Sequence, residues 1–97
     1  MSENELNGRD RFYYNINLKY FMEGDNVVVH SFDNGKYYYL EGVSAEIWLN
    51  LDGIKSIDEI VNIIDGNYEA SYNVIKNDVY AFLNDLLSNE LIESVKV

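Results

Sequence analysis

The sequence predicts an α+β fold in which a three-stranded antiparallel sheet comes first and three helices follow. Two observations lead to this prediction. Between residues 11 and 40, apolar and polar residues alternate with a period of two, and after Gly42 the period changes to about 3.6 residues. The chain has 97 residues, a length that normally supports one domain, so both patterns must share a single core.

The first strand is expected to run from Phe12 to Glu23, because every second residue of this stretch is apolar. A turn at residues 24–26 separates it from a second strand, Val27 to Phe32, which is rich in β-branched and aromatic residues. The two strands are therefore expected to form a hairpin, and the third strand follows almost at once.

A second hairpin is predicted at Asp33-Asn34-Gly35-Lys36, since Asn-Gly tolerates the positive φ that both central positions of a type I′ turn require. This turn would fix the register of the third strand, Lys36 to Leu40, against the second. The expected pairs are Phe32 with Tyr37, Ser31 with Tyr38, His30 with Tyr39, and Val29 with Leu40. Tyr38 and Leu40 then share a face with Val29, and the third strand forms an edge of the sheet.

Two short helices are expected next. Ser44 can cap the first, which carries Ile47, Trp48 and Leu51 and is expected to end at Asp52-Gly53. Ser56 and Glu59 have the spacing of a capping box and open the second helix. Gly66 is expected to close it, and its buried stripe comprises Ile57, Ile60, Val61 and Ile64.

The third helix is expected from about Ser71 to Ser88, with Asn89 in a left-handed cap conformation and a short extended tail over residues 92–97. It carries two apolar stripes. One comprises Ile75, Val79, Phe82 and Leu86, and the flank beside it comprises Lys76, Tyr80, Leu83 and Leu87. A helix buried over a wide arc explains both stripes, and a binding groove along the second stripe is the functional alternative.

The composition excludes several classes of function. With 17 acidic and 7 basic side chains the formal charge is -10, so binding to nucleic acid or to anionic membranes is not expected. The chain has no cysteine and begins without the basic and apolar regions of a secretory signal, which favours a cytoplasmic protein. Residues 1–10 carry one apolar side chain after Met1, that of Leu6, and are expected to form a disordered lead-in to a domain of residues 11–97.

No catalytic or metal-binding pattern is present in the sequence. His30 is the only histidine and lies in the middle of a predicted strand, where a packing role is commoner than catalysis or metal ligation. The neighbouring acids Asp58 and Glu59 are explained by helix capping, and Asp78 with Asp85 by a solvated helix face. We therefore expect a protein without enzymatic activity, cofactor or metal.

Several stretches of the chain resemble the PqqD-like family, whose members are also called RiPP recognition elements. The similar stretches are residues 39–53 (YLEGVSAEIWLNLDG), residues 56–60 (SIDEI), residues 78–87 (DVYAFLNDLL) and Leu91-Ile92. The resemblance as a whole spans about residues 26–93. The resemblance implies a winged helix-turn-helix fold of three strands and three helices, in agreement with the order deduced from periodicity.

The resemblance also implies a function. Members of the family bind the leader segment of a ribosomally made precursor peptide and present its core to a modifying enzyme, often a radical SAM enzyme. The leader adds as a further strand to the third strand, and its side chains enter a groove beside the last helix. On this sequence the leader-binding residues implied are Lys36, Tyr37, Tyr38, Tyr39, Leu40, Lys76, Tyr80, Leu83 and Leu87.

The chain departs from the family pattern in three places. Glu41 stands where the family usually has asparagine, and Glu90 where it usually has glycine. The first strand also has a surplus, Phe12 to Asn15, which is expected to pair with a second copy as a homodimer, to swap, or to occupy the empty groove. The alternative function is an acidic winged-helix interaction module or a transcription regulator, and a DNA reader is disfavoured by the net charge.

Overall fold

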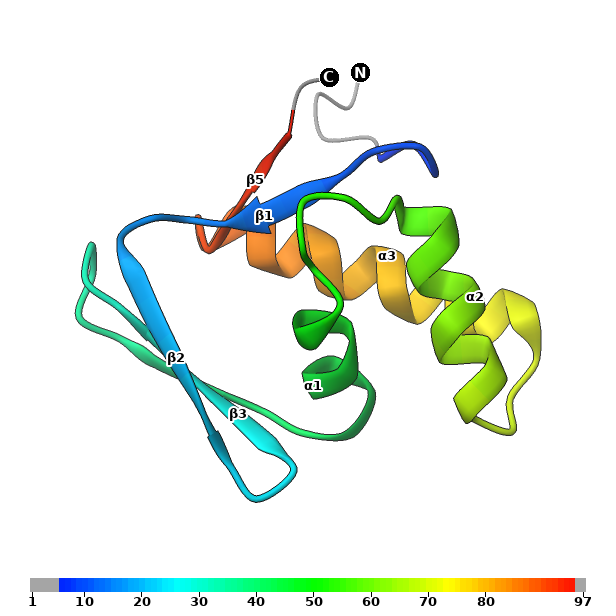
Figure 1. The fold of residues 1–97 in the computed structure, drawn as a ribbon, viewed down its shortest axis with the longest axis horizontal. Helices are drawn as coiled ribbons and strands as arrows, with labels where there is room; N and C mark the ends of the chain where they lie inside the picture. The colour runs from blue at the N-terminus through cyan, green and yellow to red at the C-terminus, as the bar shows by residue number, and fades with distance from the viewer. Residues whose placement is uncertain (1–5, 96–97) are drawn as a thin grey trace.

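A computed structural model describes residues 6–95 of the chain (Figure 1). The elements are β1 (Phe12–Tyr14), β2 (Leu18–Glu23), β3 (Asn26–Ser31), β4 (Tyr37–Leu40), α1 (Gly42–Leu49), α2 (Ile57–Asn67), α3 (Tyr72–Ser88) and β5 (Ile92–Ser94). Strands β2, β3 and β4 form an antiparallel sheet in that order, and the three helices follow. The predicted α+β fold is confirmed. Among the described helices, none is long and apolar enough to cross a membrane.

The predicted first strand is wrong in its continuity, because the chain breaks it at residues 15–17. Asn15 Oδ1 accepts from the Asn17 N–H at 2.7 Å, and the Asn15 side-chain amide donates to the Glu90 carbonyl at 3.1 Å. Asparagine side chains compete in this way with regular strand bonding. As a result β1 leaves the main sheet and pairs with β5 as a separate two-stranded sheet, with Tyr14 opposite Ile92.

The surplus residues of the first strand therefore have partners within the same chain. Beyond the β5 pairing, the Phe12 carbonyl accepts from the Gly53 N–H at 3.0 Å. The segment before β1 also lies against α2, since the Asp10 carbonyl accepts from the Ile57 N–H at 3.0 Å and the Gly8 carbonyl from the Asp58 N–H at 2.9 Å. Residues 1–5 of the expected lead-in and residues 96–97 of the expected tail lie outside the described part of the chain.

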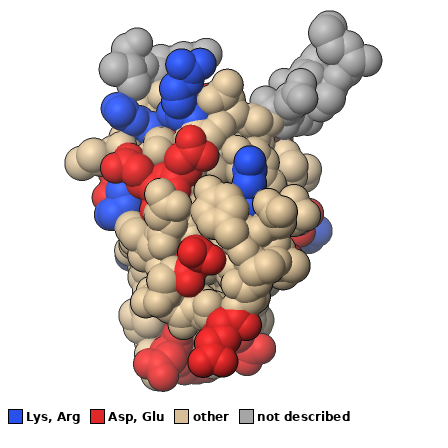
Figure 2. Space-filling view, turned by 90° about the vertical axis from the view of Figure 1, so that its right-hand side faces the viewer, with Lys and Arg blue, Asp and Glu red and all other residues tan. Residues whose placement is uncertain are grey.

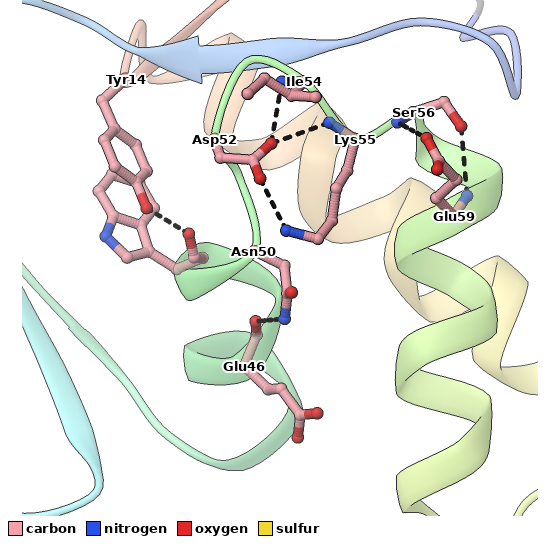
Figure 3. A network of polar contacts seen from close by, with 9 residues as sticks. Tyr14, Glu46, Asn50, Asp52, Ile54, Lys55, Ser56 and Glu59 are labelled. Atoms are coloured by element: carbon pink, nitrogen blue, oxygen red, sulfur yellow. Dashed lines mark hydrogen bonds and ion pairs between the residues drawn. The ribbon is translucent and has the colours of Figure 1, made fainter.

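The core lies between the inner face of the three-stranded sheet and the helices. Val27, Val29 and Leu40 contribute from the sheet, and Trp48 from α1 is 0% exposed. Tyr14 stacks on Trp48 with ring centroids 4.4 Å apart, and its hydroxyl donates to the Trp48 carbonyl at 2.5 Å (Figure 3). Burial raises the pKa of Tyr14, and its contact with Tyr20 raises it further, so this hydroxyl stays protonated and serves as a donor.

The predicted register of the second hairpin is wrong by two residues. His30 lies opposite Tyr37, and Val29 opposite Tyr38. The loop is longer than a type I′ turn, because the Gly35 N–H closes it on the Ser31 carbonyl at 2.9 Å, and within it only Gly35 has a positive φ, of 73°. A shift of two residues preserves the faces of a strand. Tyr38 therefore still points inward with Val29, as predicted.

The predicted ends of α1 are also wrong. The helix begins at Gly42, after an N-cap residue, Glu41, whose side chain makes no capping bond, so Ser44 lies inside its first turn. It ends before Asp52-Gly53. Asp52 instead holds a tight turn, in which its carboxylate accepts from the Ile54 and Lys55 N–H groups at 2.9 and 2.8 Å and from Lys55 Nζ at 2.7 Å (Figure 3). These bonds hold the pKa of Asp52 well below its usual range.

The capping box of α2 is confirmed. Ser56 Oγ accepts from the Glu59 N–H at 3.3 Å, and Glu59 accepts from the Ser56 N–H at 2.9 Å (Figure 3). The predicted stripe is buried, with Ile57, Ile60, Val61 and Ile64 each at most 1% exposed. Gly66 does not close the helix, which continues to Asn67.

The predicted start of α3 is confirmed, since Ser71 caps it by accepting from the Val74 N–H at 3.3 Å. The buried stripe differs from the prediction at one position. Leu83 is 0% exposed and belongs to the core, whereas Phe82 is half-buried. The helix is therefore rotated slightly about its own axis, relative to the orientation that the apolar residues of the sequence suggest.

The end of α3 is a Schellman motif. The Leu91 N–H donates to the Leu86 carbonyl at 2.9 Å and the Glu90 N–H to the Leu87 carbonyl at 3.0 Å. The left-handed residue is Glu90, with φ of 59°, and not the predicted Asn89, whose φ is -90°. Glu90 therefore occupies the position at which glycine is most easily accommodated.

We expect Glu90→Gly to stabilise the fold by about 0.5–1 kcal/mol. Glycine removes the strain of the left-handed conformation, and this gain exceeds the loss of stability that comes from the higher entropy of the unfolded glycine chain. The midpoint of thermal unfolding, followed by circular dichroism, should rise by about 3–6 °C. Glu90→Ala is the matched control, since it removes the same carboxylate but keeps a Cβ at positive φ. An equal rise in both variants would show that charge at the helix end, and not backbone conformation, is responsible.

Candidate functional site

Strand β4 is an open edge of the three-stranded sheet, as the sequence predicts. The Ser31 N–H donates to the Lys36 carbonyl at 2.9 Å, so these two residues face one another across the ladder. Because hydrogen-bonded pairs alternate along an antiparallel ladder, Tyr38 and Leu40 also direct their backbone groups toward β3. The N–H and C=O groups of Tyr37 and Tyr39 then point away from the sheet, toward the open edge.

The side chains of β4 divide between two environments. Tyr38 packs against the core, and its hydroxyl accepts from the Asn34 side-chain amide at 3.1 Å. Tyr37 and Tyr39 are 54% and 70% exposed on the outer face. His30 stacks on Tyr37 with ring centroids 4.1 Å apart, which agrees with the packing role predicted for this histidine. The edge therefore offers free backbone groups between an inner row, Tyr38 and Leu40, and an outer row of two exposed tyrosine rings.

The predicted α3 residues lie along one flank of the helix. Lys76 Nζ lies 5.8 Å from the centroid of the Tyr80 ring. Burial raises the pKa of Tyr80, and the nearby carboxylates of Asp58 and Asp10 raise it further. Since Asp58 lies in the first turn of α2 and Asp10 precedes β1, this flank of α3 faces the start of α2 and the N-terminal segment.

The opposite flank of α3 carries Asp78, Phe82 and Asp85, which lie about 140–160° around the helix axis from Tyr80. The main packing partners of α3 are α2, α1 and β5. No hydrogen bond or ring contact among residues 6–95 joins β4 to the α3 residues that the sequence selects. The predicted site residues lie in two rows, one on β4 and one on α3. Leu83 is buried in the core, and Tyr38, Tyr80 and Leu87 are partly buried against the same core.

Charged side chains are unevenly distributed over the surface. Figure 2 views the side of the molecule on which Figure 1 places α2, and acidic side chains gather at its lower end while basic ones lie mostly toward its upper end. Further acidic side chains lie beside the basic ones in the upper half and near the centre of this face (Figure 2). In the part of the chain that the structure describes, no group of three or more histidine or acidic side chains could hold a metal ion.

Two comparisons with known proteins agree with this fold. Residues 26–92 match the sequence model of the family described as "Coenzyme PQQ synthesis protein D (PqqD)". A search of curated proteins gives no match. Among solved structures, the chain is similar to "TbiB1 in Complex with the TbiA(beta) Leader Peptide", with a TM-score of 0.77 and 29% identity over 82% of this chain and 93% of that one. Because the family match covers most of the chain, from β3 to the start of β5, the protein belongs to the PqqD family.

Proposed function

We propose that this chain is a RiPP recognition element that binds the leader segment of a precursor peptide and presents the peptide core to a modifying enzyme. The observation that carries the proposal is the open edge of β4, with the backbone groups of Tyr37 and Tyr39 directed outward. An extended peptide that adds to such an edge gains main-chain hydrogen bonds, and its alternate side chains reach the two faces. The similar TbiB1 was solved in complex with a leader peptide.

The proposed role is binding without catalysis. Within residues 36–40, the outward backbone groups of Tyr37 and Tyr39 hold the leader, and the chemistry belongs to the enzyme that receives the peptide. We extend the proposal to a radical SAM enzyme as this partner, an extension that rests on the family resemblance alone. Co-purification of the chain with a radical SAM enzyme encoded beside its gene would support the extension, and a partner of another enzyme class would contradict it without affecting the leader site.

Backbone amides provide the test of the leader site. The probe is a synthetic peptide that covers the N-terminal half of the precursor encoded beside this chain, titrated by calorimetry and NMR. An affinity between about 1 μM and 10 nM is expected. Amide exchange at Tyr37 and Tyr39 should slow on binding, whereas that at Tyr38, already bonded to β3, and at Tyr20 on the opposite edge should not. Binding that leaves Tyr37 and Tyr39 unprotected would exclude strand addition at β4.

A pair of charge reversals decides which flank of α3 meets the leader. Lys76→Glu reverses a charge on the flank of α3 that the family resemblance implies as leader-binding. Asp78→Lys reverses a charge on the opposite flank. Because Tyr80 faces Asp10 and Asp58, we expect the flank with Asp78 to be the nearer to the peptide, so Asp78→Lys should change the affinity more. A larger effect of Lys76→Glu would instead support the Lys76 and Tyr80 flank, and both outcomes leave the β4 edge intact.

A further inference from the structure

Ile16 is an apolar side chain held in water by an ordered turn. It is 88% exposed, the largest value among the exposed large apolar residues of the described chain. The residues on both sides of it are fixed to distant parts of the fold. The Asn15 N–H donates to the Leu91 carbonyl at 2.9 Å, and the Asn17 carbonyl accepts from the Phe32 N–H at 2.9 Å. A side chain presented in this way loses little conformational freedom when a partner covers it.

A pocket of about 480 Å³ lies between β1, β5 and the start of β2, and Ile16 forms part of its rim. Its lining includes three tyrosines, Tyr13, Tyr14 and Tyr20. Tyr14 and Tyr20 both rest on Trp48, with ring centroids 4.4 and 5.6 Å away, so the pocket has a rigid aromatic base that continues into the core. The volume is within the range of about 300–1,000 Å³ that is typical of binding sites.

This pocket is separate from the proposed leader site. The family match begins at residue 26 and ends at residue 92, whereas the lining residues lie before residue 21 or, in the case of Glu93, after residue 92. The pocket borders β2, and β2 and β4 are opposite edges of the sheet. An occupant of the pocket therefore leaves the β4 edge free.

We propose that the occupant is a second copy of this chain, with Ile16 of each copy inserted in the pocket of the other around a two-fold axis. An exposed apolar side chain next to an aromatic pocket is self-complementary, as a two-fold interface requires. The charges of the lining agree with this, since Lys19 and Glu93 are its charged residues and a two-fold axis can pair them between copies. In a chain of net charge -10, this patch is locally neutral.

In this homodimer the two copies are joined by insertion of Ile16 side chains, and not by pairing of their first strands, as the sequence suggested. Strand β1 is already bonded to β5 within the chain, and the Gly53 N–H binds the Phe12 carbonyl. Each copy in the dimer keeps its β4 edge, so the assembly would carry two leader sites. The dimer does not depend on the proposed function, and its failure would leave leader binding untouched.

Sedimentation velocity between about 5 and 500 μM tests the dimer, since a small interface of this kind is expected to be weak and transient. The wild-type chain should shift from monomer to dimer, and Ile16→Ser should raise the dissociation constant at least tenfold, as expected of a central apolar contact. Ile54→Ser is the matched control, because Ile54 is also isoleucine, is 71% exposed and lies outside the pocket lining. It should leave the dimer unchanged.

A charge exchange tests the geometry. Lys19→Glu and Glu93→Lys should each weaken the dimer about threefold to tenfold, and the double variant should restore it. Trp48 is the only tryptophan, so its single indole NMR signal should shift as dimer forms at the Tyr14 and Tyr20 rings. A wild-type chain that stays monomeric at the highest concentration, or equal effects of Ile16→Ser and Ile54→Ser, would overturn the proposal.

Discussion

Replacing Tyr39 by proline is expected to weaken binding of the leader peptide at least tenfold. The Tyr39 N–H points to the open edge of β4, so proline removes a donor that the leader would use and places a ring in its path. The ladder between β3 and β4 uses the backbone of Tyr38 and Leu40, so this substitution removes no hydrogen bond within the chain. Titration calorimetry with the leader peptide measures the loss.

The matched control is Tyr39→Ala. It removes the same 70% exposed ring but keeps the N–H, so the leader affinity should fall much less than in Tyr39→Pro. Circular dichroism should show that both variants are folded. Equal losses in the two variants would mean that the ring, and not the backbone edge, holds the peptide. Tyr38→Pro is expected to lower the stability itself, because the Tyr38 N–H lies on the β3 side of the strand.

The starts of α2 and α3 were predictable from a few adjacent residues, although other local signals, at the turn of residues 33–36 and at Ser44 and Asn89, gave wrong predictions. The capping box at Ser56 and Glu59 and the cap at Ser71 satisfy backbone donors within three residues, so these caps need no distant partner. The break at Asn15 was not predictable in the same way. Asn15 and Asn17 occupy the polar positions of the alternation, so the pattern continues unchanged through a bend that depends on the carbonyls of Glu90 and Leu91.

The candidate site also has one part that was predictable from the sequence and one part that depends on distant contacts. The order of three strands predicts that β4 is an edge, and a register error of two residues does not alter which side chains face the core. The contribution of α3 could not be predicted, because the sequence gives angles around a helix but not the element that each flank faces. Beyond the effect of burial, the carboxylates of Asp58 and Asp10 raise the pKa of Tyr80 and so indicate which elements lie near this flank, and their position depends on tertiary packing.

Phe12→Ala is expected to lower the free energy of unfolding by about 3–5 kcal/mol. The Phe12 side chain is 4% exposed and belongs to the core, although β1 lies outside the family match. Its removal would leave a cavity beneath a strand that is held at both edges, by β5 and by the Gly53 N–H, and so cannot easily move inward. Urea unfolding measures the loss, in the Ile16→Ser background so that association does not contribute.

Tyr13→Ala is the control for this substitution, because Tyr13 is the next residue of the same strand but is 52% exposed on the other face. Its cost should be about 1 kcal/mol or less. A small effect of Phe12→Ala would mean that β1 is a loosely attached extension, and the pocket beside Ile16 would then lack a fixed wall. A large effect would make β1 and β5 a structural part of the domain, so that the proposed leader site lies within the family match and β1 and β5 build a second surface beside it.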